Sequence, residues 1–87
     1  MLPFTEKKID NSYIREFSLE TSEEEFVWHR DQEDRIIKSL NDSYWALQLD
    51  NELPKILEKD VEFFIPKGIY HRVLKGKKDL ILEIQKL

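Results

Sequence analysis

Two histidines and one aspartate are the residues of this chain whose types and spacing could do chemistry. His29 and Asp31 are two positions apart, so their side chains share one face wherever that segment is extended. His71 follows an apolar run and a Pro66-Lys67-Gly68 turn, in which proline and glycine fix the direction of the chain. Two imidazoles and one carboxylate on neighbouring strands are what a facial metal triad requires. The sequence therefore predicts one divalent metal ion held by His29, Asp31 and His71.

The predicted ligands limit the identity of the metal. Two nitrogen ligands and one oxygen ligand suit iron, manganese, nickel, copper or zinc. The chain contains no cysteine, so a closed structural zinc site of the usual thiolate type is not expected.

Three further polar residues are candidates for the same site. Glu33 shares the parity of His29 and is an alternative carboxylate ligand, although a strand would place it about 13 Å farther along, which favours Asp31. Arg35 could pair with Asp31 or Glu33, or it could hold an anionic substrate. Gln48 could point inward as a hydrogen-bonding group.

The composition excludes several classes of protein. The 87 residues are 40% hydrophobic and 37% charged, which is typical of a single folded domain. A net charge of −4 argues against nucleic acid as a partner. No window approaches the roughly 18 apolar residues of a membrane span, and the first residues do not resemble a signal peptide. With no cysteine, we expect a cytoplasmic protein, with residues 1–12 as an N-terminal arm and a barrel core over residues 13–87.

Short apolar runs separated by turn-forming or charged residues predict an all-β fold, either a small barrel or a sandwich. A helix over Glu23–Leu40 is rejected because the apolar residues of that segment do not form one continuous helical stripe. The expected strands are Tyr13–Leu19, Glu25–Asp31, Arg35–Leu40, Tyr44–Asp50, Lys55–Leu57, Val61–Ile65, His71–Leu74 and Leu80–Leu87.

The alternation of side chains also predicts an interface. If His29 and Asp31 face the barrel interior, so does Val27, whereas Phe26 and Trp28 face outward. Two large aromatic side chains on an outer face need cover. A terminal segment or a second subunit would supply it, and we expect a homodimer.

The segment from Asp60 to His71 resembles the second sequence motif of the cupins, which are small β-barrels that usually hold one metal ion. That motif is a glycine, five residues, Pro-x-Gly, two residues and a histidine ligand. Val61–Ile65, Pro66–Gly68 and His71 match this spacing, and Asp60 stands where the first glycine would be. The asparagine that follows in the motif is Lys75 here.

The segment that begins at His29 resembles the first cupin motif less completely. That motif reads His-x-His, three or four residues, Glu, six residues and Gly. His29 and Asp31 stand at the paired ligand positions, Arg35 stands at the glutamate position and Asp42 at the closing glycine. The resemblance covers roughly residues 24–87, and its second motif is the more specific of the two.

The resemblance implies a small cupin-like β-barrel (a double-stranded β-helix or jelly roll) of about seven or eight strands. It implies a metal-binding protein whose metal could act on a small anionic substrate oriented by Arg35. A metal-free ligand-binding module and a dimerisation module are alternatives from a different class, in which Asp31 and Arg35 pair with each other. A non-haem iron oxygenase is a weaker alternative, because Ile81 stands near where such enzymes carry a basic residue for the co-substrate.

Overall fold

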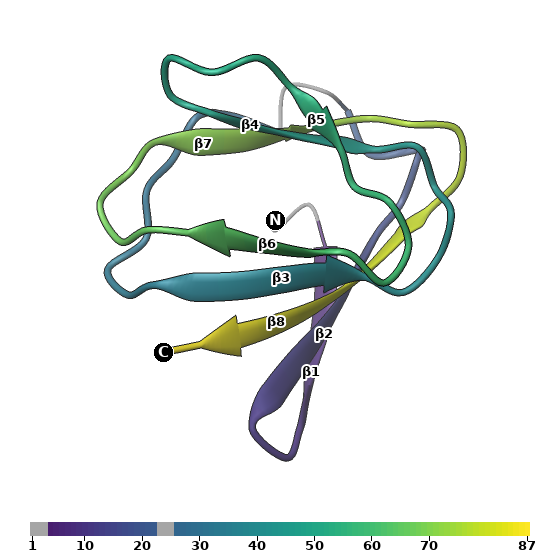
Figure 1. The fold of residues 1–87 in the computed structure, drawn as a ribbon. Coiled ribbons are helices and arrows are strands. Elements are labelled where there is room, and N and C mark those ends of the chain that lie inside the picture. Colours follow the sequence, from purple (N-terminus) through teal and green to yellow (C-terminus); the bar gives the residue numbers. More distant parts are fainter. Residues whose placement is uncertain (1–3, 23–25) are drawn as a thin grey trace.

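In the computed structural model, which describes residues 4–22 and 26–87, all regular structure is β-strand and forms two sheets (Figure 1). The five-stranded sheet has the order β1-β2-β8-β3-β6, and the three-stranded sheet has the order β5-β4-β7. The predicted all-β barrel is confirmed, and the described residues form 8 strands. The strands are β1 (Phe4–Ile9), β2 (Ser12–Phe17), β3 (Arg35–Ser39), β4 (Ala46–Leu49), β5 (Lys55–Ile56), β6 (Glu62–Ile65), β7 (His71–Leu74) and β8 (Leu80–Lys86).

The two sheets enclose a core built by the alternation of side chains along each strand. On β8, Leu80, Leu82 and Ile84 point inward and are at most 3% exposed. Ile37 lies opposite Ile84 in the antiparallel register and is equally buried. Trp45, the residue directly before β4, is also part of the core, and its indole Nε1 donates a hydrogen bond to the Lys78 carbonyl at 2.5 Å.

The turn before β7 is fixed to the segment that carries the first predicted ligands. Gly68 has a φ of 79°, in the left-handed region that glycine adopts most readily, and its N–H donates to the Asp31 carbonyl at 2.9 Å. The N–H of Lys67 donates to Asp34 Oδ1 at 2.7 Å. Asp60 also has a left-handed φ, of 66°, which explains how an aspartate can stand where the cupin motif has glycine.

The predicted strand over Glu25–Asp31 was wrong within the described residues, and Glu25 itself lies outside them. Only His29 pairs with β7, through an isolated bridge to His71. Because the backbone is not continuously extended, the inward and outward pattern expected there also fails. Phe26 packs inward, with ring centroids 6.1 Å from Phe17 and 5.3 Å from Trp45.

The inward position of Phe26 also changes the exposure of the two residues that follow it. Val27, expected in the interior, is 60% exposed. Trp28 is 40% exposed, and the Arg72 guanidinium lies 4.7 Å from its ring centroid. Of the two aromatic residues expected on the outer face, Phe26 therefore packs against the core instead.

Strand β1 lies in the segment expected as an arm. It pairs with β2 from Phe4 opposite Phe17 to Ile9 opposite Ser12, and the hairpin forms one edge of the five-stranded sheet (Figure 1). The rejection of a helix over residues 23–40 holds for the described residues of that range. Nowhere in residues 4–22 and 26–87 is there a helix long and apolar enough to cross a membrane.

Candidate metal centre

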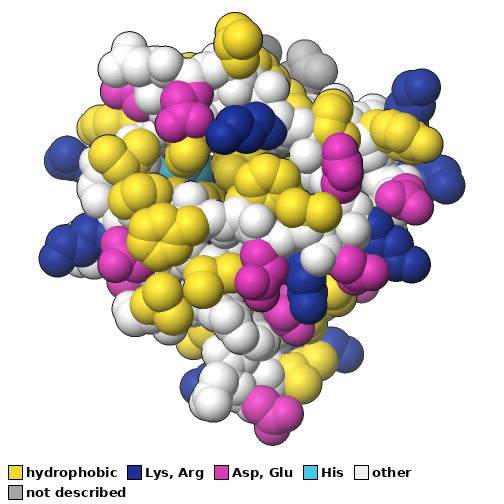
Figure 2. Space-filling view, in the orientation of Figure 1, with side chains coloured by type: hydrophobic (Ala, Val, Ile, Leu, Met, Phe, Trp, Pro, Cys, Tyr) yellow, Lys and Arg dark blue, Asp and Glu magenta, His cyan; other side chains and the backbone are white. Residues whose placement is uncertain are grey.

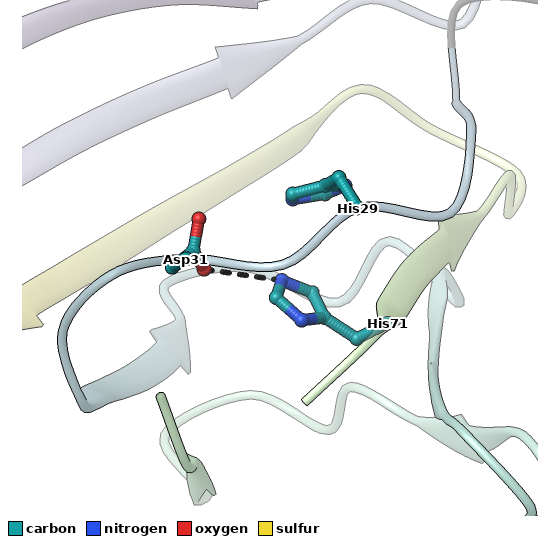
Figure 3. Close-up of side chains that lie close together, drawn as sticks. All are labelled: His29, Asp31 and His71. Carbon is teal, nitrogen blue, oxygen red and sulfur yellow. Dashed lines mark ion pairs between the residues drawn. The ribbon is translucent and has the colours of Figure 1, made fainter. Parts of the chain in front are cut away.

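The structure brings the three predicted ligands together at the beginning of β7. His71 is the first residue of β7, and His29 lies beside it, joined by two backbone hydrogen bonds of 3.0 Å and 2.8 Å. Asp31 follows two residues later and turns toward His71 (Figure 3). One potential ligand atom from each side chain lies within 4.8 Å of the others.

Backbone carbonyls fix the tautomer of both histidines. His29 Nδ1 lies 3.0 Å from the Val27 carbonyl oxygen, and His71 Nδ1 lies 2.9 Å from the Ile69 carbonyl oxygen. A carbonyl oxygen only accepts hydrogen bonds, so each Nδ1 carries the proton and donates it. Each Nε2 is then left with a free lone pair, which is the form of imidazole that binds metals.

Asp31, the third predicted ligand, directs a carboxylate oxygen toward His71 Nε2. Asp31 Oδ2 lies 3.2 Å from His71 Nε2, is buried, and has no hydrogen-bond donor among the described residues. Burial is the main cause that lowers the pKa of His71 from its ordinary value, so the imidazole is neutral near pH 7. Two lone pairs this close repel each other unless a cation lies between them. The donor set therefore fits a metal ion.

Arg35 holds the other oxygen of the same carboxylate. Its Nη2 lies 3.4 Å from Asp31 Oδ1 and 3.1 Å from Glu33 Oε1, and the side chain is 12% exposed. The guanidinium pairs with both carboxylates and does not stand between Oδ2 and the imidazoles. Glu33, the alternative ligand, is engaged by Arg35 and is not part of the convergent group.

The three ligands open onto a cavity of about 260 Å³ inside the barrel. In Figure 2, histidine atoms lie recessed between hydrophobic side chains on the face shown. His71 is 4% exposed, whereas His29 is an exposed residue. The cavity is lined by Phe4, Arg15, Phe17, Phe26, Val27, His29, Asp31, Arg35, Ile37, Leu47, Ile65, His71, Val73, Leu82 and Ile84.

The structure does not bring Gln48 to this cavity. Its neighbour Leu47 lines the cavity, and alternation along β4 directs Gln48 to the other face. There its amide oxygen accepts from Arg72 Nε at 2.9 Å, and its amide nitrogen donates to the Glu52 carbonyl at 3.1 Å.

Sequence reasoning missed Arg15, a second arginine on the cavity wall. The available signal was the alternation Tyr13, Arg15, Phe17 along a strand that was predicted correctly in its main part. Phe4 was missed as well, because its segment was expected to be an arm.

Comparison with solved structures identifies the fold. KdgF from Halomonas sp. superposes with a TM-score of 0.75 at 13% identity, covering 97% of this chain and 80% of that chain. A cupin domain from Bordetella pertussis Tohama I gives 0.62 at 20% identity, covering 99% of this chain and 95% of the other. A structure from a study of the DMSP lyases RdDddP and RnDddQII gives 0.71 at 12% identity and covers 84% of this chain.

These matches show that the chain has the cupin fold, as the two sequence motifs implied. The chain spans only 35% of the length of the DMSP lyase structure. No family model and no curated protein matches the sequence.

Proposed function

We propose that this protein binds one divalent metal ion through His29 Nε2, His71 Nε2 and Asp31 Oδ2. The observation that carries the proposal is the buried Asp31 Oδ2, which faces a neutral imidazole nitrogen at 3.2 Å and has no donor among the described residues. A bound cation would remove the repulsion between these lone pairs. It would also satisfy a polar atom whose burial otherwise costs about 1–3 kcal/mol.

The donor set fits iron, manganese, nickel, copper or zinc. Three protein ligands leave coordination positions open, as in catalytic rather than structural sites. When bound, such an ion supplies Lewis-acid chemistry toward an oxygen atom of a substrate. The residues of the chain prepare this site: backbone carbonyls orient His29 and His71, and Arg35 orients Asp31 through its Oδ1.

The ligand that fits the remaining space is a small molecule. The cavity of about 260 Å³ lies below the usual range for drug-sized ligands, and most of its lining side chains are apolar. Arg35 borders the cavity and could contact an anionic group, as the sequence predicted, although two carboxylates already share its charge.

Elemental analysis of purified protein and of matched carboxylate variants tests the metal proposal. We expect near-stoichiometric metal in the unmodified protein and in Glu33→Gln, because Glu33 is held by Arg35. We expect less than a tenth of that content in Asp31→Asn and in His71→Ala. Equal metal content in all four proteins, or none after reconstitution, would overturn the proposal.

A metal-free ligand-binding module is the second candidate. The ion pair between Arg35 and Asp31, which this alternative requires, favours it. It predicts that Asp31 acts in stability alone, so that replacing Asp31 weakens the fold and removes no metal. A homodimer and a cytoplasmic location remain predictions. Exposed Trp28 still supports the dimer, which sedimentation at micromolar concentration would detect.

A further inference from the structure

Two arginines line the cavity, and only Arg35 contacts a proposed metal ligand. Arg15 has no role in the proposed metal site. It lies opposite Leu82 in the antiparallel register of β2 and β8, so the two side chains share one face. Leu82 is 3% exposed and belongs to the core. Arg15 therefore projects into the barrel from the sheet wall, and it lines the same cavity as His29, Asp31 and His71.

The contacts of Arg15 leave part of its guanidinium free. Its Nε donates to Glu6 Oε2 on the neighbouring strand, and its Cζ lies 4.1 Å from the ring centroid of Phe4. Among the described residues, no acceptor contacts its two terminal amino groups, although the side chain is only 14% exposed. A guanidinium has five N–H donors, so most of its hydrogen-bonding capacity is available to a ligand.

A comparison with Arg35 shows why Arg15 is the better anion contact. Arg35 is held by two carboxylates, Asp31 and Glu33, one of which it positions for the metal. Arg15 has one carboxylate partner, which lies on an edge strand and is 27% exposed. Unpaired donors in a cavity whose lining is mostly apolar favour a ligand with acceptor oxygens.

We propose that Arg15 anchors the anionic group of a small amphipathic carboxylate whose apolar body fills the cavity between β2 and the metal centre. The aromatic and aliphatic walls contributed by Phe17, Phe26, Ile37 and Val73 would contact that body. This inference names the substrate class of the proposed metal site and rests on that proposal for its functional meaning. The anion contact itself does not require the metal.

Benzoate and its neutral counterpart benzamide test the charge recognition directly. Isothermal titration of metal-free protein in EDTA, with each compound, compares the unmodified protein with Arg15→Gln and Glu6→Gln. Lys7→Gln is the matched control, because Lys7 is an exposed cation on β1 whose side chain alternates to the face opposite Glu6. Circular dichroism verifies that each variant is folded.

We expect benzoate to bind the unmodified protein more tightly than benzamide. Arg15→Gln should weaken benzoate about tenfold, equivalent to about 1.4 kcal/mol, and leave benzamide unchanged. Glu6→Gln should tighten benzoate, because it removes the competing carboxylate, and Lys7→Gln should have no effect. Because Arg15→Gln and Glu6→Gln should change the affinity for benzoate in opposite directions, the test remains valid if one of the two variants fails to fold.

Equal affinities for benzoate and benzamide in the unmodified protein, including no measurable binding of either, would overturn the inference. So would benzoate binding that Arg15→Gln and Glu6→Gln leave unchanged. Failure of the metal proposal is a separate outcome, because elemental analysis would detect it. The benzoate measurement uses metal-free protein and does not depend on that result.

Discussion

Replacing Asp31 by asparagine should stabilise the metal-free protein while abolishing metal binding. The two side chains have nearly the same shape, but the amide presents an N–H donor where the carboxylate presents an acceptor. Asp31 Oδ2 lies 3.2 Å from His71 Nε2, which is hydrogen-bonding distance for an amide nitrogen and an imidazole lone pair. Asparagine can therefore form a bond that aspartate cannot.

The magnitude follows from three contributions. The new hydrogen bond adds about 1 kcal/mol to the free energy of unfolding, and removal of an unsatisfied buried oxygen adds about 1–3 kcal/mol. Loss of the charge opposite Arg35, 3.4 Å away, subtracts about 1 kcal/mol, since Glu33 still pairs with that guanidinium. The net gain is about 1–3 kcal/mol, which raises the Tm of a domain this small by roughly 4–24 °C.

Thermal unfolding at pH 8 in EDTA measures this effect. Asp34→Asn is the control, because Asp34 Oδ1 already accepts a hydrogen bond from the Lys67 N–H at 2.7 Å. We expect its Tm to stay the same or fall. A lower Tm for Asp31→Asn than for the unmodified protein would refute the reasoning, and would favour a structural ion pair between Asp31 and Arg35.

Three further predictions concern protonation and packing. Because the pKa of His71 is lowered in the folded protein, the unfolded chain binds a proton more readily. The free energy of unfolding of the metal-free protein should therefore be highest above about pH 6.5 and should fall below that pH. The urea midpoint should be lower at pH 5.5 than at pH 7.5, and equal midpoints would contradict this prediction. Gly76→Ala should cost more than about 2 kcal/mol in the same assay, because a Cβ at Gly76 would lie 2.2 Å from the Ser43 carbonyl oxygen. Phe26→Ala should cost about 3 kcal/mol and Val27→Ala under about 0.5 kcal/mol by thermal unfolding, and equal losses would argue against the inward position of Phe26.

Much of the fold could be predicted from local sequence patterns. Along β8, the alternation of Leu80, Leu82 and Ile84 with less buried residues indicates a half-buried strand, and the structure confirms it. Strand β1 was missed because Phe4 and Ile9 are its only apolar residues and stand at its two ends. Its pairing with β2, which no local pattern records, makes it a strand.

The part of the candidate site that could be predicted is the part that local sequence features record. His29, Asp31 and His71 were found because the Pro66–Gly68 turn and the spacing of the motifs are local features. Alternation with Phe17 was a local signal for Arg15, but the long-range register that places Arg15 opposite Leu82 on the cavity wall was not predicted.

The segment before His29 shows a second limit. An alternating pattern predicts side-chain direction only where the backbone is continuously extended. Between Phe26 and Trp28 the backbone forms no strand, so Phe26 could turn inward against Trp45. The aromatic contact decided the direction of that side chain.

The most direct test of the metal centre is a long-range ¹H–¹⁵N NMR spectrum of the imidazole rings during titration with zinc. The chain has 2 histidines, so both rings can be followed without overlap. In metal-free protein at pH 8, both rings should carry the proton on Nδ1, which donates to a backbone carbonyl. Zinc should shift both Nε2 resonances to values typical of metal ligands, saturating at one equivalent, and should shift neither in Asp31→Asn. Nε2-protonated rings, or a spectrum unchanged by zinc, would contradict the account.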